Sequence, residues 1–353
     1  MSQEMLRYVQ SADGTRIAWC ESGAGPQTIV LAANHITDIK SDRIFPRRWD
    51  IIEHLSERFR VVRYDHRGCG SSQRNVERQG QDAWVEDLDA VIRAASPEVR
   101  VILSAPSQAA PYGAVFAARH PQRLSHLILH GCCRCGAVAG GSPSAIAHHN
   151  AMIELIRVGW DSPNPQTRTF VATAFVPDPS SEGLDWARRL PSMINREDAL
   201  RFFKASAEQD ARAYTSRITT PTLVAAFEGD PIVPPELSRS FAAAIASAHY
   251  IEYPGGGHVP TKGEGRFEAA FDHLVAFVSK DSVDDPLSAL TSRERDILDG
   301  VRAGLSNEAI ALQRNLSPRT VRNHLSRIFD KLRVNSRTQA ALLASRSEVR
   351  RSN

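Results

Sequence analysis

The sequence lacks a hydrophobic segment of the kind that crosses or enters a membrane. None of its apolar runs reaches the roughly 20 residues that span a bilayer, and the stretch MSQEMLR at its start has no signal-peptide core. These absences argue against an integral membrane protein and against secretion. We therefore expect a cytoplasmic protein that makes no contact with a membrane.

Cysteine is also scarce. The chain has five cysteines among 353 residues, an odd number, and three of them crowd together at Cys132, Cys133 and Cys135. This arrangement suits neither a disulfide framework nor the four-ligand spacing of a zinc site. We expect reduced thiols, with a redox role as the alternative, and we predict neither a metal ion nor a cofactor.

The positive charge of the chain is concentrated at its C-terminal end. From Leu287 onward there are 13 Lys and Arg against 6 Asp and Glu, a net +7, which leaves 30 against 34, a net −4, in the preceding residues. A chain of this length has room for one large domain and one small one. The uneven charge predicts a small basic domain, of the kind that binds nucleic acid, at the C-terminal end.

Strand-like and helix-like segments alternate in the first third of the chain. A hairpin is expected first, because residues 6–9 and 15–19 flank Asp13-Gly14, a pair that accepts positive φ. The later strands are largely apolar, which is typical of strands buried on both faces. The alternation predicts an α/β fold with a parallel, helix-covered sheet. Its expected strands are Thr28–Ala33, Arg60–Tyr64, Val99–Ser104 and His126–His130, and its expected helices are Trp49–Glu57, Asp82–Ala94 and Gln108–Arg119.

A serine occupies the junction between one of these strands and the next helix. Ser107 lies within Val101–Ala110, with the small residues Ala105 and Ala109 two positions to either side. A nucleophilic serine at a sharp strand-to-helix turn needs small flanking residues, because the tight backbone brings them close to neighbouring strands. Ser107 is therefore the candidate nucleophile.

Two further segments place an acid and then a histidine after strands. Residues 221–234 are a strand-like run that ends in an acidic turn at Asp230, and His258 follows three glycines after the expected strand His249–Tyr253. Taken singly, such an Asp is usually a helix cap and such a His is usually a loop residue. Together with Ser107, the order of the three predicts a catalytic triad.

Residues 6–280 resemble the α/β-hydrolases. Besides the ordered triad, Asp65–Ser72 (DHRGCGSS) is similar to the D-x-R-G-x-G-x-S turn of that family. The resemblance implies an α/β-hydrolase fold in which His258 deprotonates Ser107, and Asp230 orients the imidazole and stabilises its charged form. The chain differs from the family pattern G-x-S-x-G, because alanines replace both glycines, and this leaves the activity open.

The same resemblance implies an oxyanion hole and a cap. The amide of Gln108 is one expected oxyanion donor, and the second is that of His35 or Ile36, where most of these hydrolases have His-Gly. Residues from about 132 to 217 interrupt the strand-helix rhythm, so we expect a helical cap that selects the ligand. A minority of its large apolar residues should face the cavity, the candidates being Trp160, Phe170, Phe175, Trp186, Met193 and Phe202.

Four helical segments follow residues 281–286, a polar stretch ending in proline that we expect to be a linker. The first opens with a Thr291/Glu294 capping box and closes at Gly304, and the second starts at Ser306. The third starts at Ser317-Pro318, a capping serine followed by a proline at the first helical position. The last is Ser336–Ala344.

The third segment, Ser317–Leu332, has the pattern of a DNA-recognition helix. Val321, Leu325 and Ile328 form one buried stripe, and the opposite face carries hydrogen-bond donors without carboxylates. Such a helix alone is more often an ordinary amphipathic helix with a basic face, but the tight turn before it gives the spacing of a helix-turn-helix. We expect Arg322, Asn323 and Ser326 to meet base edges, with Arg327 on the same face, and Arg319, Thr320, Lys331 and Arg337 to meet phosphates.

Residues 287–346 resemble the four-helix DNA-binding domain of the LuxR/GerE type, which implies double-stranded DNA as a partner and binding as a homodimer. We expect exposed Ala340, Leu343 and Ala344 on the last helix to form the dimer contact. The domains expected are therefore 1–280, the linker 281–286, and 287–353.

This combination resembles a group of bacterial hydrolase-like regulators. The first hypothesis is a transcriptional regulator whose hydrolase-like domain binds a small-molecule effector under its cap and hydrolyses it slowly or not at all. The second is an active serine hydrolase of an ester, lactone or amide, which consumes its own signal. The third is a constitutive DNA-binding protein with a hydrolase relic, which the retention of Asp230 and His258 disfavours.

Overall fold

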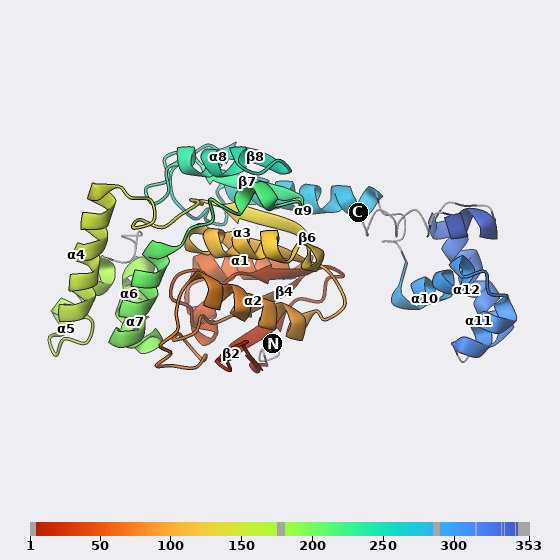
Figure 1. Ribbon diagram of the computed structural model, residues 1–353, viewed down its shortest axis with the longest axis horizontal. Helices are drawn as coiled ribbons and strands as arrows, with labels where there is room; N and C mark the ends of the chain where they lie inside the picture. Colours follow the sequence, from red (N-terminus) through yellow and green to blue (C-terminus); the bar gives the residue numbers. More distant parts are fainter. Residues whose placement is uncertain are drawn as a thin grey trace. The chain divides into compact units, whose positions relative to one another are not determined.

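The computed structural model describes residues 5–174, 181–284, 290–314, 316–332, 334, 336–342 and 344 (Figure 1). The chain divides into two compact units, Met1–Leu274 and Val275–Asn353. Each unit is described by itself. No helix among the described residues is both long enough and apolar enough to cross a bilayer.

The first unit is built on an eight-stranded sheet with the strand order β1-β2-β4-β3-β5-β6-β7-β8. The first two strands form the expected hairpin and pair antiparallel, and β2 also pairs antiparallel with β4. The remaining neighbours are parallel, which confirms the predicted α/β fold. The strands are β1 (Arg7–Gln10), β2 (Arg16–Ser22), β3 (Thr28–Leu31), β4 (Arg60–Tyr64), β5 (Val101–Pro106), β6 (Leu124–His130), β7 (Thr222–Phe227) and β8 (Ala248–Tyr253).

Two sets of helices cover the two faces of this sheet. The main core joins Leu103 and alternate residues of the neighbouring strands to Leu88 of α2, Phe116 of α3 and Phe241 of α8. Side chains of the opposite face point toward α1 and α9, and His54 of α1 contacts Phe271 of α9 with ring centroids 4.5 Å apart. The bounds are α1 (Pro46–Ser56), α2 (Gln81–Ala95), α3 (Ala110–Arg119), α8 (Pro235–Ala243) and α9 (Gly265–Asp284), with short 3-10 helices at Ile39–Ile44, Ser107–Ala109, Pro121–Arg123 and Thr215–Arg217.

The turn after β4 is held by buried charges. The Arg67 guanidinium donates to Asp87 at 2.8 and 2.6 Å and to Asp13 at 2.7 Å, so its burial is compensated by ion pairs and hydrogen bonds. Asp65 accepts the amides of Ile39 and Ser71 at 2.8 and 2.7 Å. These bonds hold the turn after β4, which lies at the same edge of the sheet as the candidate site.

Four helices intervene between β6 and β7, in the interval predicted to be helical, and Figure 1 shows them grouped at one end of the sheet. The Asp198 carboxylate accepts the amides of Asn75 and Val76 at 2.7 and 3.1 Å, and the amide of Gly70 donates to the Met193 carbonyl at 2.8 Å. The cap is thus tied to the loop after β4. Its helices are α4 (Pro143–Gly159), α5 (Pro165–Thr173), α6 (Ser181–Met193) and α7 (Arg196–Glu208).

After residue 284, the described residues of the second unit form three helices and a further helical segment at residues 337–342. Its core includes Ile297, Val301, Ile310, Val321 and Ile328. The helices begin where their capping residues predict: the Thr291/Glu294 capping box is formed, and Ser306 and Ser317 accept the amides of Ala309 and Thr320. Their bounds are α10 (Ser292–Arg302), α11 (Asn307–Gln313) and α12 (Pro318–Leu332).

The predicted linker is in part helical. Residues 281–284 are the last turn of α9, and residues 285 and 286 lie outside the described residues. A single helix therefore begins in the first unit and ends in the second.

Candidate functional site

Ser107 lies at a sharp turn where β5 ends. Its φ is +48°, a left-handed value that is rare and strained for a residue with a side chain. The strand before it and α3 after it hold this conformation, and the side chain is 7% exposed. The geometry of the predicted nucleophile turn is therefore present, although the residue is not glycine.

The alanine that replaces the first glycine of the motif has a compensating partner. Ala105 is fully buried, and a methyl group added to Gly113 of α3 would lie 2.5 Å from the Cβ of Ala105. Real Cβ atoms do not approach this closely, so only glycine fits at position 113 while alanine occupies position 105. The helix, rather than the strand, supplies the space that this turn needs.

The side chains of His258 and Asp230 lie within hydrogen-bonding distance of each other. Nδ1 of His258 lies 2.7 Å from Oδ2 of Asp230, and Oδ1 of Asp230 accepts the amides of Ile232 and Val233 at 2.8 and 3.0 Å. Burial alone would raise the pKa of Asp230, but the hydrogen bond and charge of His258 and the two amides lower it overall. The carboxylate is thus held ionised and oriented toward the imidazole.

The imidazole of His258 packs against the backbone of Gly131. This glycine follows β6 with a φ of +49°, and a methyl group on it would lie 2.7 Å from Cε1 of His258. Its missing side chain therefore leaves the space that the ring fills.

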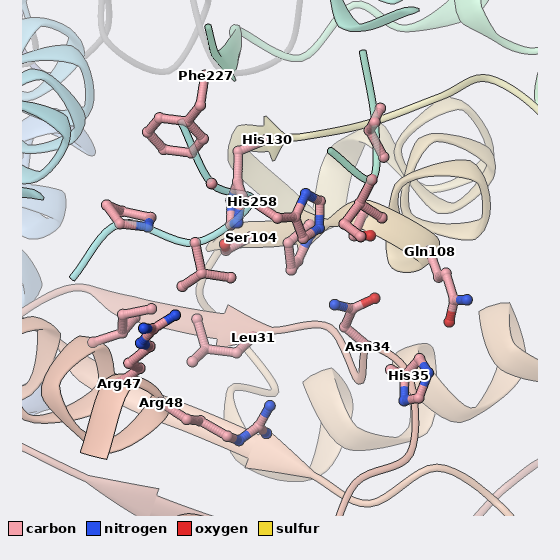
Figure 2. A pocket seen from close by; sticks show the side chains of 18 of the residues that line it. Leu31, Asn34, His35, Arg47, Arg48, Ser104, Gln108, His130, Phe227 and His258 are labelled. Atoms are coloured by element: carbon pink, nitrogen blue, oxygen red, sulfur yellow. The ribbon is translucent and has the colours of Figure 1, made fainter. Parts of the chain in front are cut away.

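Ser107 and His258 line one cavity, part of which is shown in Figure 2. No hydrogen bond joins their side chains in the described part of the chain. Of the two links expected in the triad, the structure thus forms the one between His258 and Asp230. Catalytic hydrogen bonds to the nucleophile are often long in free enzymes and shorten when substrate binds, so this geometry leaves the triad prediction standing.

One histidine beside His258 in the cavity, His130, was not predicted from the sequence. His130 is the last residue of β6, the strand between those that carry Ser107 and Asp230, and Figure 2 shows it beside His258. Burial lowers the pKa of His130 to about 4, with a further contribution from the charge of His258. It is therefore neutral near pH 7. The sequence did contain a signal for His130, because it is a polar residue at the end of an otherwise buried strand that follows the nucleophile strand.

The three residues predicted for the oxyanion hole also line the cavity. Burial lowers the pKa of His35 to about 4, and its ring packs against Trp186 with centroids 5.2 Å apart. Nδ1 of His35, Oδ1 of Asn34 and Oε1 of Gln108 are buried without a hydrogen-bond partner among the described residues. Such unpaired atoms are costly and need an explanation, which a bound ligand would supply. The oxyanion role of Gln108, His35 and Ile36 stays a prediction.

The cavity has a volume of about 1310 Å³ and lies partly under the cap. Of the residues predicted to face it, Trp186 and Met193 do so, whereas Trp160 and Phe202 are buried in the core of the unit and Phe170 is 67% exposed. Phe175 lies outside the described residues.

The outer face of α12 is accessible, as predicted. Val321, Leu325 and Ile328 are buried against the other helices of the unit. The exposed side chains on the opposite face are those of Arg319, Arg322, Asn323, Ser326 and Arg327.

Three of the residues predicted to contact phosphate have partners within this unit. Lys331 donates to Glu294 at 2.6 Å and Arg337 donates to Asn307 at 2.8 Å, and their phosphate contacts stay predictions. The Thr320 hydroxyl bonds to the capping Ser317 at 2.8 Å. The predicted dimer contact is wrong in its residues, because Ala340 and Ala344 are buried in the core of the unit; Leu343 lies outside the described residues.

Comparison with known families assigns both parts of the chain. Residues 288–344 match the family described as "Bacterial regulatory proteins, luxR family". Residues 41–178 match the "alpha/beta hydrolase fold", and residues 145–267 match "Serine hydrolase (FSH1)".

Curated relatives match limited stretches of the chain. The transcriptional activator DevR/DosR of Mycobacterium tuberculosis is 46% identical over 68 residues, which is 19% of this chain and 30% of that protein. The probable oxidoreductase EphD of Mycobacterium bovis is 35% identical over 100 residues, 27% of this chain and 16% of that protein. The chain thus spans less than a third of the length of these relatives.

Solved structures match the fold of the first unit. An esterase from Thermogutta terrifontis has a TM-score of 0.61 at 22% identity, covering 78% of this chain and 99% of its own. An enol-lactonase from Burkholderia xenovorans has the same TM-score and identity, covering 77% and 100%. The chain is therefore an α/β-hydrolase-fold domain followed by a DNA-binding helix-turn-helix domain of the luxR family of bacterial regulatory proteins.

Proposed function

We propose that this protein is a transcriptional regulator whose hydrolase-fold domain binds a small acyl compound and retains a slow serine-hydrolase activity toward it. The observation that carries the proposal is the His258–Asp230 pair, whose histidine lines the same large cavity as Ser107, in a chain that also has a luxR-family DNA-binding domain. Slow turnover would prolong the time for which the bound ligand acts as a signal before it is hydrolysed.

The chemistry follows from the three side chains. The Ser107 hydroxyl would attack the ligand carbonyl while its proton passes to Nε2 of His258, and Asp230 would stabilise the imidazolium. The amide of Gln108, with that of His35 or Ile36, would hold the developing oxyanion. His258 would then protonate the leaving group, and water would release the acyl group from Ser107.

Polar recognition of the ligand would occur on the cap side of Ser107. The unpaired atoms of Asn34, His35 and Gln108 gather there, and each would gain a hydrogen bond from a polar group of the ligand. Since His35 is kept neutral by burial, its ring nitrogens can accept as well as donate.

The output would come from α12 in the major groove of DNA. We propose base contacts for Arg322, Asn323 and Ser326, with Arg319 and Arg327 on the flanking phosphates. Domains of this kind usually read two half-sites, so we also propose a homodimer, with a contact other than Ala340 and Ala344.

The second candidate is an enzyme that consumes its signal at an ordinary rate. The ordered His258–Asp230 pair favours it, because a relic would have no reason to keep this geometry. Turnover of 4-nitrophenyl acetate by the wild type and by Ser107→Ala separates the two. A rate well above that of the variant, at one turnover per second or more, would favour the enzyme.

Coupling to DNA is tested with a duplex selected from a random library. The wild type is labelled at Ser107 with a serine-directed phosphonate, and its affinity for the duplex is measured against unlabelled protein. We expect a change of about fivefold or more, since typical allosteric couplings are of that size. Ser107→Ala treated in the same way is the control. Equal affinities for labelled and unlabelled wild type would reject ligand sensing and leave a constitutive DNA-binding protein.

A further inference from the structure

The cavity that contains Ser107 does not end beneath the cap. It continues across one face of the sheet, where it is lined by Leu31, Ser104, Ile128 and Leu223. These four residues come from β3, β5, β6 and β7 and are direct neighbours in the strand registers, Leu31 beside Ser104, Ser104 beside Ile128, and Ile128 beside Leu223. The floor of this part of the cavity is thus a row across four adjacent strands.

Helices α1 and α9 form the opposite wall. Ile51 and Leu55 of α1 and Ala270 and Leu274 of α9 line the cavity here. Ile51, Ala270 and Leu274 remain partly accessible although each faces the sheet, which is expected when they border a void rather than other side chains. We call this region the sheet-side lobe, defined by Leu31, Ile128, Leu223, Ile51, Ala270 and Leu274.

The two ends of the cavity differ in chemistry. In the view of Figure 2, Leu31, Ser104 and Phe227 lie on one side of His258, and Asn34, His35 and Gln108 lie on the other. The cap side carries unpaired polar atoms, whereas the six residues that define the sheet-side lobe are all aliphatic; the Ser104 hydroxyl lies in their row, and Figure 2 shows Arg47 and Arg48 beside Leu31. A polar group in that lobe would lose its hydrogen bonds to water without replacement, but an alkyl chain would gain affinity by up to about fourfold for each buried methylene.

We propose that the sheet-side lobe binds the aliphatic acyl chain of the ligand, so that the ligand class is a medium-chain acyl ester or amide. This rests on the proposed role of Ser107 as nucleophile. The acyl group remains bonded to Ser107 after the first step, whereas the leaving group must depart and be replaced by water. A lobe between the sheet and two helices suits the part that stays.

The position of the lobe also places the acyl chain against α9. Ala270 and Leu274 lie on α9, the helix that begins in the first unit and ends in the second. An acyl chain in the lobe contacts this helix directly, and a ligand without the chain does not. Such a difference in contacts is what allows a ligand to favour one position of α9 over another.

Two pairs of probes test the lobe. The reactive pair is the methyl 4-nitrophenyl ester of ethylphosphonate and that of octylphosphonate: Oγ of Ser107 bonds to phosphorus, its proton passes to His258, and 4-nitrophenolate leaves. The labelling rate is followed by nitrophenolate absorbance and by intact mass. The unreactive pair is methyl propanoate and methyl octanoate, whose binding to the Ser107→Ala variant is followed by tryptophan fluorescence.

In the wild type the octyl phosphonate should label Ser107 about tenfold faster or more than the ethyl one, and methyl octanoate should bind Ser107→Ala tighter than methyl propanoate by a similar factor. Ala270→Phe, which fills the lobe, should abolish both preferences, because the octyl and ethyl probes would then find the same space. Ala276→Phe, at an exposed position of the same helix, is the matched control. Leu274→Trp is a second lobe-filling variant if Ala270→Phe fails to fold.

The outcomes separate the two proposals. Equal labelling rates and equal ester affinities would overturn the lobe while leaving Ser107 as the nucleophile. A chain-length preference in ester binding without labelling of Ser107 would support the lobe and overturn the nucleophile. The octyl label should also slow amide exchange in residues 267–279 more than the ethyl label, and identical exchange would overturn the assigned contact with α9.

Discussion

Arg322 is an exposed side chain on the face of α12 that we assign to base contacts. Arg322→Ala should weaken binding to a matched duplex by about 1–3 kcal/mol and relax base preference at one position, because a guanidinium reads guanine through two hydrogen bonds. Fluorescence anisotropy with matched and scrambled duplexes measures both effects. Equal losses on the two duplexes would show that Arg322 contacts phosphate and that the orientation of α12 is wrong.

Lys331 illustrates how a partner distant in sequence changes a prediction. Its ammonium lies 2.6 Å from Glu294, a member of the capping box of α10. Lys331→Ala should therefore lower the stability of the unit by about 0.5 kcal/mol and leave the salt dependence of DNA binding unchanged. Arg327→Ala should instead reduce that slope by about one unit. Thermal denaturation and a salt titration of both variants distinguish these roles, and a shallower slope for Lys331→Ala would restore it as a phosphate contact.

At the scale of elements, β5 and α3 are fitted to each other through Ala105 and Gly113. Gly113→Ala should destabilise the first unit by about 1–3 kcal/mol, because its methyl group would meet that of Ala105. Adding Ala105→Gly should recover most of the loss, because the methyl group then sits on the helix instead of the strand. Urea denaturation of the two single variants and the double variant gives the coupling energy. Additive effects would mean that the two residues do not compete for space.

The starts of helices and the parallel pairing of most of the sheet were predictable because their causes are local. Ser306, Ser317 and the Thr291/Glu294 box act within three residues, and the strand-helix alternation gives the parallel sheet. What was missed depends on residues far apart in the chain. The inward orientation of Ala340 requires the whole helical core, since a small residue fits either face of a helix.

The candidate site was likewise predictable only in part. The order of Ser107, Asp230 and His258 was visible in the sequence, but His130 enters the site only because β6 lies between β5 and β7. The sheet-side lobe could not be predicted, because a void is a property of packing and not of any one residue.

At the scale of the whole molecule, buried histidines should make the protein sensitive to mild acid. Burial lowers the pKa of His35 to about 4, of His66 to about 3 and of His130 to about 4. In the unfolded chain each of these histidines has its ordinary pKa near 6.5 and binds a proton below that pH. Folding stability should therefore rise with pH between about 4 and 6.5 and fall as the pH is lowered through this range. Burial raises the pKa of Asp65 to about 7. Below this pH the folded protein binds a proton at Asp65 that the unfolded chain does not bind until lower pH, and this offsets the effect of one histidine.

Melting temperatures at constant ionic strength between pH 7 and pH 5 measure this dependence. His66→Asn should flatten it, because one of the protons taken up on unfolding is removed. His148→Gln is the control at an exposed position and should leave the dependence unchanged. If the wild type were equally stable at both pH values, the histidines would not be held neutral in the folded protein.

The hydrogen bonds of Asp198 to Asn75 and Val76, and the bond from the amide of Gly70 to the Met193 carbonyl, anchor the junction of α6 and α7. The residues that follow α7 are anchored as well, because the Gln209 side chain donates to the Gln108 carbonyl at 3.1 Å and the amide of Asp210 donates to the Gln81 side chain at 2.8 Å. Since α7 is held at both ends, we expect any movement that admits a ligand to take place elsewhere in the cap. Entry should occur at α4 and α5, and their amides should exchange with deuterium faster than those of α7.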